Sequence, residues 1–436
     1  MARLGSFSRF RLVSGVVASF ALIGIVIVLS SPSGASARHQ ATPSVRDASI
    51  GSWVSTWAAG PQSATLRNEF PNGLDDQTVR NIVLTTVGGT RVRVGFSNQF
   101  GTRPLEIGRA AVGLAGAGAQ MPPAPSVALS FGGRRTVVIP PGAQTLSDPV
   151  RFTVRPGERL AVSVFVPRPT GRPTLHGVAR QVNYVAAGNQ VFSRGSGAFR
   201  TRTQAGYFVG GVAVLDPHPG AATIVTVGDS ITDGFGSSVG ANARWPNDLA
   251  RRLGARAGGN LAVIDEGIGG NRVLTNSTYY GPAAVERFRR DALEQPGVRG
   301  VILLEGINDI GMSHSRARLS TPHVKVTAAQ IITGYERIIA EAHAAGVKIF
   351  GGTLLPFQGS QNWTPGGEAE REAVNHWILT SGAFDGVIDF ARAVADRRNP
   401  LRLNPAYDSG DHLHPNDAGY RAMAAAINLR PLLALK

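Results

Sequence analysis

The spacing of apolar residues changes partway along the chain, and this change limits the possible folds more than any other feature. Between residues 52 and 216, apolar and polar residues alternate in short runs such as 92–96 and 160–166, with Gly and Pro turns between them. Short strands at regular spacing, with no helical pattern between them, predict an antiparallel β-sandwich. The segment 216–220, Asp-Pro-His-Pro-Gly, ends this pattern and is the expected domain boundary.

The rest of the chain alternates continuous apolar runs with amphipathic stretches. The expected strands are 222–227, 261–264, 301–304, 348–354 and 387–390, and the expected helices are 245–253, 285–293, 327–345, 368–379 and 417–429. Strands alternating with helices predict an α/β domain with a parallel sheet and helices on both faces. We therefore expect a sandwich domain over 45–216 and an α/β domain over 221–436, with functional residues just after the strands.

The N-terminus has the features of a targeting signal. Arg3, Arg9 and Arg11 precede an apolar run over 12–30, and Ala-Ser-Ala follows at 35–37. This order predicts a signal peptide over 1–37 and a secreted, extracellular protein. An uncleaved anchor is the alternative, because the run approaches the roughly 20 residues that span a bilayer. No later apolar run is comparable, so no stable membrane insertion is expected after cleavage.

Composition excludes several classes of function. The 436 residues include no cysteine, which rules out disulfides, thiolate catalysis and cysteine-ligated metals. The formal net charge is +15, almost all of it from scattered arginines. No basic stretch is interleaved with aromatic residues, so no nucleic-acid partner is expected. A solvated basic surface is the simplest interpretation, with adhesion to an anionic polymer or cell wall as the alternative. The oligomeric state is left open.

Four polar clusters lie where predicted strands end or where the last helix begins. They are Gly-Asp-Ser-Ile-Thr-Asp-Gly at 228–234, Gly-Ile-Gly-Gly-Asn-Arg at 267–272, Gly-Ile-Asn-Asp at 306–309 and Asp-His-Leu-His-Pro at 411–415. Each cluster is weak evidence alone. Their order and their positions at strand or helix junctions together predict one site.

These clusters hold the groups that serine esterase chemistry needs. Ser230 supplies a hydroxyl at a strand-to-helix turn, and His414 supplies a base to take its proton. Asp411 lies three residues before His414, close enough to bond the imidazole and fix its tautomer. Gly270 offers a backbone N–H, and Asn308 a side-chain amide, to a developing oxyanion.

Other acidic residues of these clusters are interpreted as structural. Asp229 and Asp233 are expected to bond or cap their own loop. Asp309 is expected to hold its own loop in shape.

The same clusters contain alternatives to the catalytic base and acid, and they partly resemble a metal site and a dinucleotide loop. His412 competes with His414 as the base, and Asp408 is a weaker alternative to Asp411 as the acid. The 411–415 cluster imitates a metal site, but no outer ligands are visible, so no metal is expected. The glycines of 267–270 lack the spacing and the first-strand position of a dinucleotide loop, so no cofactor is expected.

Together these motifs resemble those of the GDSL, or SGNH, hydrolases, which are serine esterases on a flavodoxin-like sheet. The resemblance spans about residues 221–430 and includes all four clusters. It implies the same catalytic roles for the five residues named above: nucleophile, Asp-x-x-His pair and two oxyanion donors. Gly269 is the alternative to Gly270, because Asp-Glu-Gly at 265–267 stands where the family often has an asparagine.

The front half resembles the secreted two-domain members of this family. The resemblance rests on Trp-Val-Ser-Thr-Trp at 53–57 and Gly-Phe-Ser-Asn-Gln-Phe-Gly-Thr-Arg-Pro-Leu at 95–105. These members are similar to xylan-associated acylhydrolases and arylesterases, which implies that the sandwich helps to bind carbohydrate. The expected function is hydrolysis of short-chain esters, above all O-acetyl groups on poly- or oligosaccharides, through an acyl-enzyme. The alternatives are a lipase or arylesterase acting on other esters, and a carbohydrate-binding protein or acyltransferase on the same fold.

Overall fold

The computed structural model describes residues 52–216, 218–313, 315 and 318–435, all of which belong to one compact unit. The predicted signal peptide over 1–37 lies outside the described residues, and its cleavage stays a prediction. Within the described ranges, no helix is both long and apolar enough to cross a membrane.

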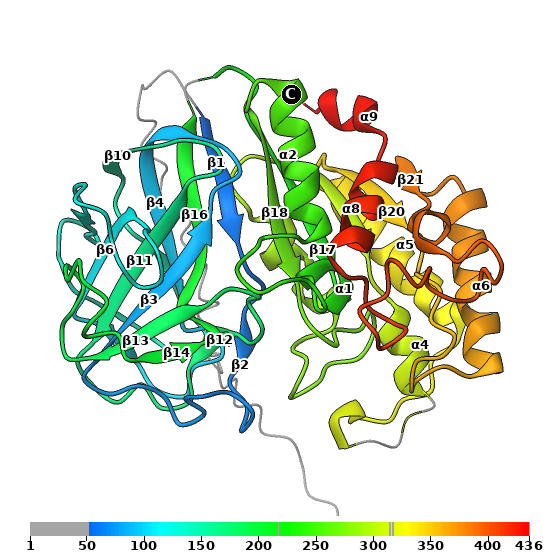
Figure 1. Ribbon diagram of the computed structural model, residues 1–436, viewed down its shortest axis with the longest axis horizontal. Helices are drawn as coiled ribbons and strands as arrows, with labels where there is room; N and C mark the ends of the chain where they lie inside the picture. The colour runs from blue at the N-terminus through cyan, green and yellow to red at the C-terminus, as the bar shows by residue number, and fades with distance from the viewer. Residues whose placement is uncertain (1–51, 217, 314, 316–317, 436) are drawn as a thin grey trace, which may run out of the picture. The chain divides into compact units, whose positions relative to one another are not determined.

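The N-terminal half contains two large antiparallel sheets (Figure 1). The first has the strand order β1 (Ser52–Ala58), β16 (Val209–Asp216), β4 (Gly89–Ser97), β10 (Val150–Val154), with β9 (Gln144–Leu146) beside β4. The second has the order β14 (Thr201–Thr203), β13 (Asn183–Ala187), β3 (Gln77–Leu84), β11 (Arg159–Val166), β6 (Arg109–Leu114), β7 (Val127–Ala128). Two small sheets accompany them, formed by β15 (Gly206–Tyr207), β12 (Thr174–His176) and β2 (Gln62–Ser63), and by β5 (Leu105–Ile107) and β8 (Val137–Ile139).

Both large sheets contribute side chains to one hydrophobic core. Val92 and Val94 of β4 belong to the same buried cluster as Val162 and Val164 of β11. These are the apolar positions of the two-residue pattern, because successive side chains of a strand point to opposite faces. The antiparallel β-sandwich that the alternation predicts is therefore confirmed.

The C-terminal half is built on a five-stranded sheet whose neighbouring strands are all parallel. Its order is β18 (Leu261–Gly267), β17 (Ala222–Gly228), β19 (Val298–Leu304), β20 (Lys348–Gly352), β21 (Gly386–Ile388). Numbered along the domain this is 2-1-3-4-5, the flavodoxin-like order. Every residue of β17 is buried, as a central strand with cover on both faces must be.

Helices connect these strands and fall into two packed groups. One group includes α2 and α8, and the other includes α3, α5 and α6 (Figure 1). The helices are α1 (Ser230–Asp233), α2 (Trp245–Ala257), α3 (Ala284–Phe288), α4 (Ile307–Ser313), α5 (Ala328–Ala344), α6 (Pro365–Thr380), α7 (Phe390–Val394), α8 (Asp417–Ala426) and α9 (Leu429–Leu433).

Capping residues explain where the helices agree with the sequence prediction and where they differ. Thr327 and Gln330 form a capping box at the start of α5, and Gly346, with φ of +69°, follows its end. The closing helix predicted over 417–429 is instead two helices, because Asn428 starts a new one by accepting a backbone hydrogen bond. The helix predicted over 285–293 is α3 followed by a π-helical turn.

The sandwich and the α/β half share their cores along β1. Ala262 of β18 packs in the sandwich cluster, and Ala58 of β1 packs in the α/β cluster. The backbone N–H of Ser55 donates to the Pro296 carbonyl at 2.9 Å and to Thr223 Oγ1 at 3.0 Å. The two halves are therefore joined by packing and by buried hydrogen bonds, while the domain limits 45–216 and 221–436 stay predictions.

We predict that Gly267→Ala lowers the free energy of unfolding by about 1–3 kcal/mol, the usual cost of overpacking. A Cβ at Gly267 would lie 2.3 Å from the backbone nitrogen of Asp233, so α1 would have to move. The matched control is Gly254→Ala within α2, where a Cβ meets nothing within 4 Å and helix propensity should stabilise by up to about 1 kcal/mol. Urea denaturation measures both changes, and equal midpoints for Gly267→Ala and the wild type would contradict the prediction.

Candidate active site

Three of the four predicted clusters meet at one edge of the parallel sheet. Gly228 at the end of β17 is paired in register with Gly267 of β18 and with Leu304 of β19. The segments that follow these residues therefore leave the sheet side by side, as the rule for the carboxyl ends of parallel strands requires.

Ser230 is the first residue of α1, directly after β17. Asp229 caps this short helix by accepting the backbone N–H of Ile231 at 2.9 Å, and Gly234, with φ of +88°, ends it. Asp229 is therefore a capping residue, as predicted. Burial raises the pKa of Asp229 to about 7, against the opposing effect of the Ile231 hydrogen bond. Ser230 itself is buried but retains 8% of its surface exposed.

The fourth cluster brings an imidazole and a carboxylate to Ser230. Ser230 Oγ lies 2.8 Å from His414 Nε2, and His414 Nδ1 lies 2.6 Å from Asp411 Oδ2. The backbone N–H of His414 also donates to Asp411 Oδ1 at 2.9 Å. Partial burial opposes ionisation of Asp411, but the hydrogen bonds from His414 and its positive charge hold the pKa of Asp411 well below its usual value. The three side chains have the geometry of a hydroxyl, its base and the acid that orients the base.

Two groups capable of holding an oxyanion lie in the same cleft as Ser230. Gly270 has φ of +75°, and a Cβ there would lie 2.3 Å from the Tyr280 ring, so only glycine fits. Asn308 Nδ2 donates to the Asn271 carbonyl at 3.0 Å, which fixes the amide and leaves its second hydrogen available. Gly269 lines the cleft as well, so the choice between the two glycines stays a prediction.

The competing pair from the sequence is present but is directed elsewhere. His412 Nδ1 lies 2.6 Å from Asp408 Oδ2, so this exposed imidazole contacts a different carboxylate. The Ser230 hydroxyl is bonded by His414, so the spacing chosen from the sequence agrees with the geometry. Among the described residues, no group of three or more His, Asp or Glu side chains is placed to hold a metal ion.

The C-terminal half matches a known family over most of its length. Residues 226–422 match the model of the GDSL-like lipase/acylhydrolase family. This match lies within the C-terminal half and covers less than half of the whole chain. The chain is a carboxylic ester hydrolase, and its sandwich precedes the half that matches this family, which we call the GDSL domain.

Several solved structures are similar to about half of the chain. A GDSL-like lipase from Bacteroides thetaiotaomicron is 17% identical, with a TM-score of 0.36, over 50% of this chain and 90% of its own. An acetylxylan esterase from Geobacillus stearothermophilus is 21% identical, with a TM-score of 0.36, over 47% of this chain and 91% of its own. An alpha/beta hydrolase enzyme from the metagenome of Lake Arreo, Spain, is 20% identical, with a TM-score of 0.37, over 49% of this chain and 94% of its own. A search of curated protein sequences finds no match.

Two acids of the GDSL domain have roles that the sequence analysis did not foresee. Asp309 accepts the backbone N–H groups of Val273 at 2.7 Å and Leu274 at 3.2 Å. It thus also holds the loop after β18 that contains Gly270, a role beyond the predicted one in its own loop. Asp233 was expected to serve its own loop, but it bonds His176 Nε2 of the sandwich at 3.1 Å. No local motif marks His176, because its partner is 57 residues away.

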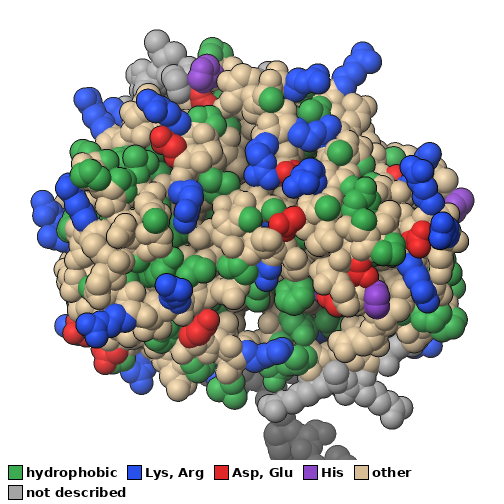
Figure 2. All heavy atoms as spheres, viewed as in Figure 1, with side chains coloured by type: hydrophobic (Ala, Val, Ile, Leu, Met, Phe, Trp, Pro, Cys, Tyr) green, Lys and Arg blue, Asp and Glu red, His purple; other side chains and the backbone are tan. Residues whose placement is uncertain are grey.

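The cleft that contains these residues is wide, and the sandwich forms one of its walls. Its volume is about 870 Å³. The residues that the sandwich contributes are Gln62, Ser63, Thr65, Arg67, Asn68, Leu175, Gly177 and Val178. The GDSL domain faces them with Tyr279, Tyr280, Met312, Leu319, Ser360, Gln361 and Asn362, among others. Figure 2 shows a hollow below the middle of the drawn face, close to where Figure 1 draws β2.

The basic residues are spread over the surface and are not gathered at this cleft. On the face drawn in Figure 2, Lys and Arg side chains are scattered among other residues without forming a single patch. This distribution agrees with the interpretation of a solvated basic surface on that face.

We predict that Asn308→Ala lowers kcat by about 100-fold or more, the usual effect of removing one oxyanion donor. The side chain lines the cleft, and its second amide hydrogen has no other partner within the described residues. Turnover of p-nitrophenyl acetate measures the loss, and thermal melting checks that the variant is folded. Full turnover in a folded variant would remove Asn308 from the oxyanion site.

We also predict that the two histidines of the 411–415 cluster differ sharply. His414→Ala removes the base bonded to Ser230 and should reduce kcat by about 1,000-fold or more. His412 lines the cleft but contacts Asp408 and not Ser230, so His412→Ala should leave kcat within about tenfold of the wild type. Steady-state kinetics on one small ester compares them, and the reverse ranking would identify His412 as the base.

Proposed function

We propose that the chain is a secreted esterase that removes short acyl groups, above all acetyl, from carbohydrates. The observation that carries the ester chemistry is the Ser230–His414–Asp411 arrangement at the floor of the two-domain cleft. The substrate class rests on the lining of that cleft and on the resemblance of the sequence to the xylan-associated group. Secretion rests on the signal-like segment 1–37 alone.

In the proposed mechanism, His414 takes the proton of Ser230 as the hydroxyl oxygen attacks the ester carbonyl. Asp411 stabilises the imidazolium that forms, and the N–H groups of Ser230 and Gly270 with the Asn308 amide hold the oxyanion. The carbon–oxygen bond to the alcohol then breaks, and His414 returns the proton to the leaving oxygen. Water, deprotonated by His414, releases the acyl group and restores Ser230.

The chemistry of the cleft walls supports a carbohydrate as the leaving alcohol. Side-chain amides line the cleft and can bond sugar hydroxyls; they belong to Gln62, Asn68, Gln361 and Asn362. The oxygens of Gln62 and Asn68 already accept from the sandwich, so these two would act as donors through their NH₂ groups. Tyr279 and Tyr280 add flat apolar surface with polar edges. A volume of about 870 Å³ exceeds what an acetyl ester of a simple alcohol needs and leaves room for an oligosaccharide.

Two of these amides belong to the sandwich, which gives that domain a role in binding the substrate. Gln62 and Asn68 lie on the sandwich wall, while Ser230 lies on the GDSL domain. In our proposal the sandwich binds the sugar part of the substrate within the active cleft itself, so no separate carbohydrate site is needed.

We predict that residues 38–436 hydrolyse p-nitrophenyl acetate faster than butyrate and butyrate faster than octanoate, and that Ser230→Ala abolishes all three activities. Acetylated xylan should then release acetate, and Gln62→Ala should raise KM for the polymer while leaving kcat/KM for p-nitrophenyl acetate within about twofold. Rates that rise with chain length would favour a lipase.

The same assays separate the remaining alternatives. Acetate transferred to an added sugar acceptor in place of water would identify an acyltransferase. Equal and negligible rates for folded wild type and Ser230→Ala would contradict the esterase proposal and leave a binding role for the cleft.

A further inference from the structure

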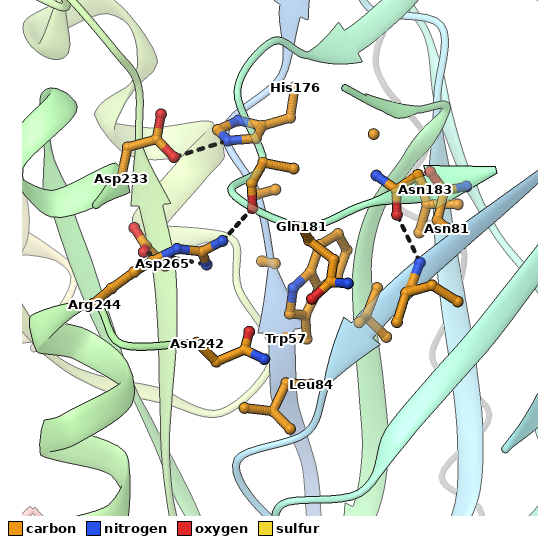
Figure 3. A pocket seen from close by; sticks show the side chains of 17 residues that line it. Trp57, Asn81, Leu84, His176, Gln181, Asn183, Asp233, Asn242, Arg244 and Asp265 are labelled. Carbon is orange, nitrogen blue, oxygen red and sulfur yellow. Dashed lines mark hydrogen bonds and ion pairs between the residues drawn. The ribbon is translucent and has the colours of Figure 1, made fainter. Parts of the chain in front are cut away.

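A polar junction lies at the end of α1, between the sandwich and the GDSL domain (Figure 3). His176 at the end of β12 points from the sandwich side toward Asp233, the last residue of α1. Arg244 and Asp265 of the GDSL domain lie beside this pair and face a cavity of about 30 Å³. A cavity of that size and polarity holds one or two water molecules.

The hydrogen bonds of His176 define its protonation state. Its Nδ1 lies 3.0 Å from the Gly60 carbonyl oxygen, and its Nε2 lies 3.1 Å from Asp233 Oδ1. Both partners are acceptors, and a neutral imidazole carries only one N–H. With Asp233 ionised, both contacts are therefore satisfied only when His176 is an imidazolium, and the residue is just 7% exposed.

The charged groups around the ring support this state. Burial favours the neutral ring and Arg244 repels the charge, but the Asp233 carboxylate and the two hydrogen bonds outweigh both effects, so the pKa of His176 is raised. Burial raises the pKa of Asp265 to about 7, so this carboxyl becomes negative near neutrality and then favours the imidazolium further. Arg180, on the same segment as His176, also faces Asp233.

The same segment of the sandwich supports both halves of the proposed catalytic pair. Asp233 lies one helical turn after Ser230, and its backbone N–H donates to the Asp229 carbonyl at 2.9 Å. Arg180 lies over the Phe235 ring with 5.8 Å between its guanidinium carbon and the ring centre. Phe235 in turn packs on His414, with ring centres 4.7 Å apart. The backbone carbonyl of Arg180 accepts the N–H of Gly240 at 2.8 Å, which fixes the segment in place.

We propose that His176 is a positioning residue of the esterase: as an imidazolium, it ties the sandwich to the end of α1 and thereby holds Ser230 against His414. The proposal rests on the function proposed above, because it assigns His176 a role in that reaction. His176 touches neither substrate nor reacting atoms and acts through Asp233.

The pH dependence of this tie has a definite sign. Because folding raises the pKa of His176, its contribution to stability is complete below the pKa of an unfolded histidine and is lost as pH rises through the folded pKa. Because the same contact positions Ser230, kcat should also fall as pH rises through the folded pKa of His176. The wild type should therefore lose kcat and thermal stability together as pH rises above the range in which an unfolded histidine titrates.

Two variants test the proposal in different ways. His176→Asn keeps a donor for the Gly60 carbonyl but cannot reach Asp233, so kcat should fall roughly ten- to hundredfold with little change in KM. Asp233→Asn lets a neutral His176 accept from the introduced amide, so kcat should stay closer to the wild type but its alkaline decline should disappear. His343→Asn is the control, since it breaks an exposed histidine–aspartate pair with Asp385 on the GDSL surface.

The measurements are kcat and KM for p-nitrophenyl acetate and the melting temperature, taken from about pH 6 to pH 9.5 on the full chain. A folded His176→Asn variant with wild-type kcat and pH profile would overturn the proposal, as would an unchanged alkaline decline in Asp233→Asn. Ser230→Ala is assayed alongside. Activity that survives in Ser230→Ala contradicts the proposed function instead, so the two failures are distinguishable.

Discussion

The site depends on one buried guanidinium, that of Arg287 in α3. Arg287 has no exposed surface, and it donates to the Gly228 carbonyl at 2.9 Å, the Glu266 carbonyl at 2.7 Å and the Asn271 side chain at 2.8 Å. These groups lie at the ends of β17 and β18 and in the loop that contains Gly270. Asp291, at 3.2 Å, supplies the opposite charge. Removing one partner of such a buried pair typically costs about 3–5 kcal/mol, so the guanidinium fixes the spacing of the two segments that carry Ser230 and Gly270.

The acids of the site fall into two kinds, because burial raises the pKa of some and hydrogen bonds lower the pKa of another. Burial is the cause for the first kind. It raises the pKa of Asp229 to about 7 and that of Asp309 to about 6, and it also raises that of Glu305. Asp411 is the exception, because its half-exposed carboxylate accepts hydrogen bonds directly from His414 and its pKa is lowered. Groups whose surroundings push their pKa values apart take different roles. Here the fully ionised acid is the one that contacts the imidazole, while Asp229 and Asp309 cap and brace loops.

The sequence could predict those parts of the fold and site that depend on short spacing. The alternation around Val92 reflects the two-residue repeat of side chains along a strand, and the continuous apolar run of β17 reflects a strand covered on both faces. Asp411 reaches His414 because the two residues lie within one turn. The roles of Asp309 and His176 could not be read in this way. Asp309 bonds a loop 35 and 36 residues away, and His176 bonds a residue 57 away in another domain. Each contact depends on how separate elements pack, and neither leaves a local pattern.

The shortness of α1 explains why such distant contacts matter. A helix of four residues forms little more than its first turn, and nucleation of a turn is unfavourable on its own. The position of Ser230 must therefore be set by what surrounds α1: the Asp229 cap at its start, the close approach of Gly267 beneath it and the His176 bond at its end. Two of these contacts come from the parallel sheet and its first turn, and the third comes from the sandwich. The sandwich thus helps to position Ser230 through the His176–Asp233 bond, in addition to forming a wall of the cleft. Without the sandwich, the GDSL domain would lack one of the three contacts that hold α1.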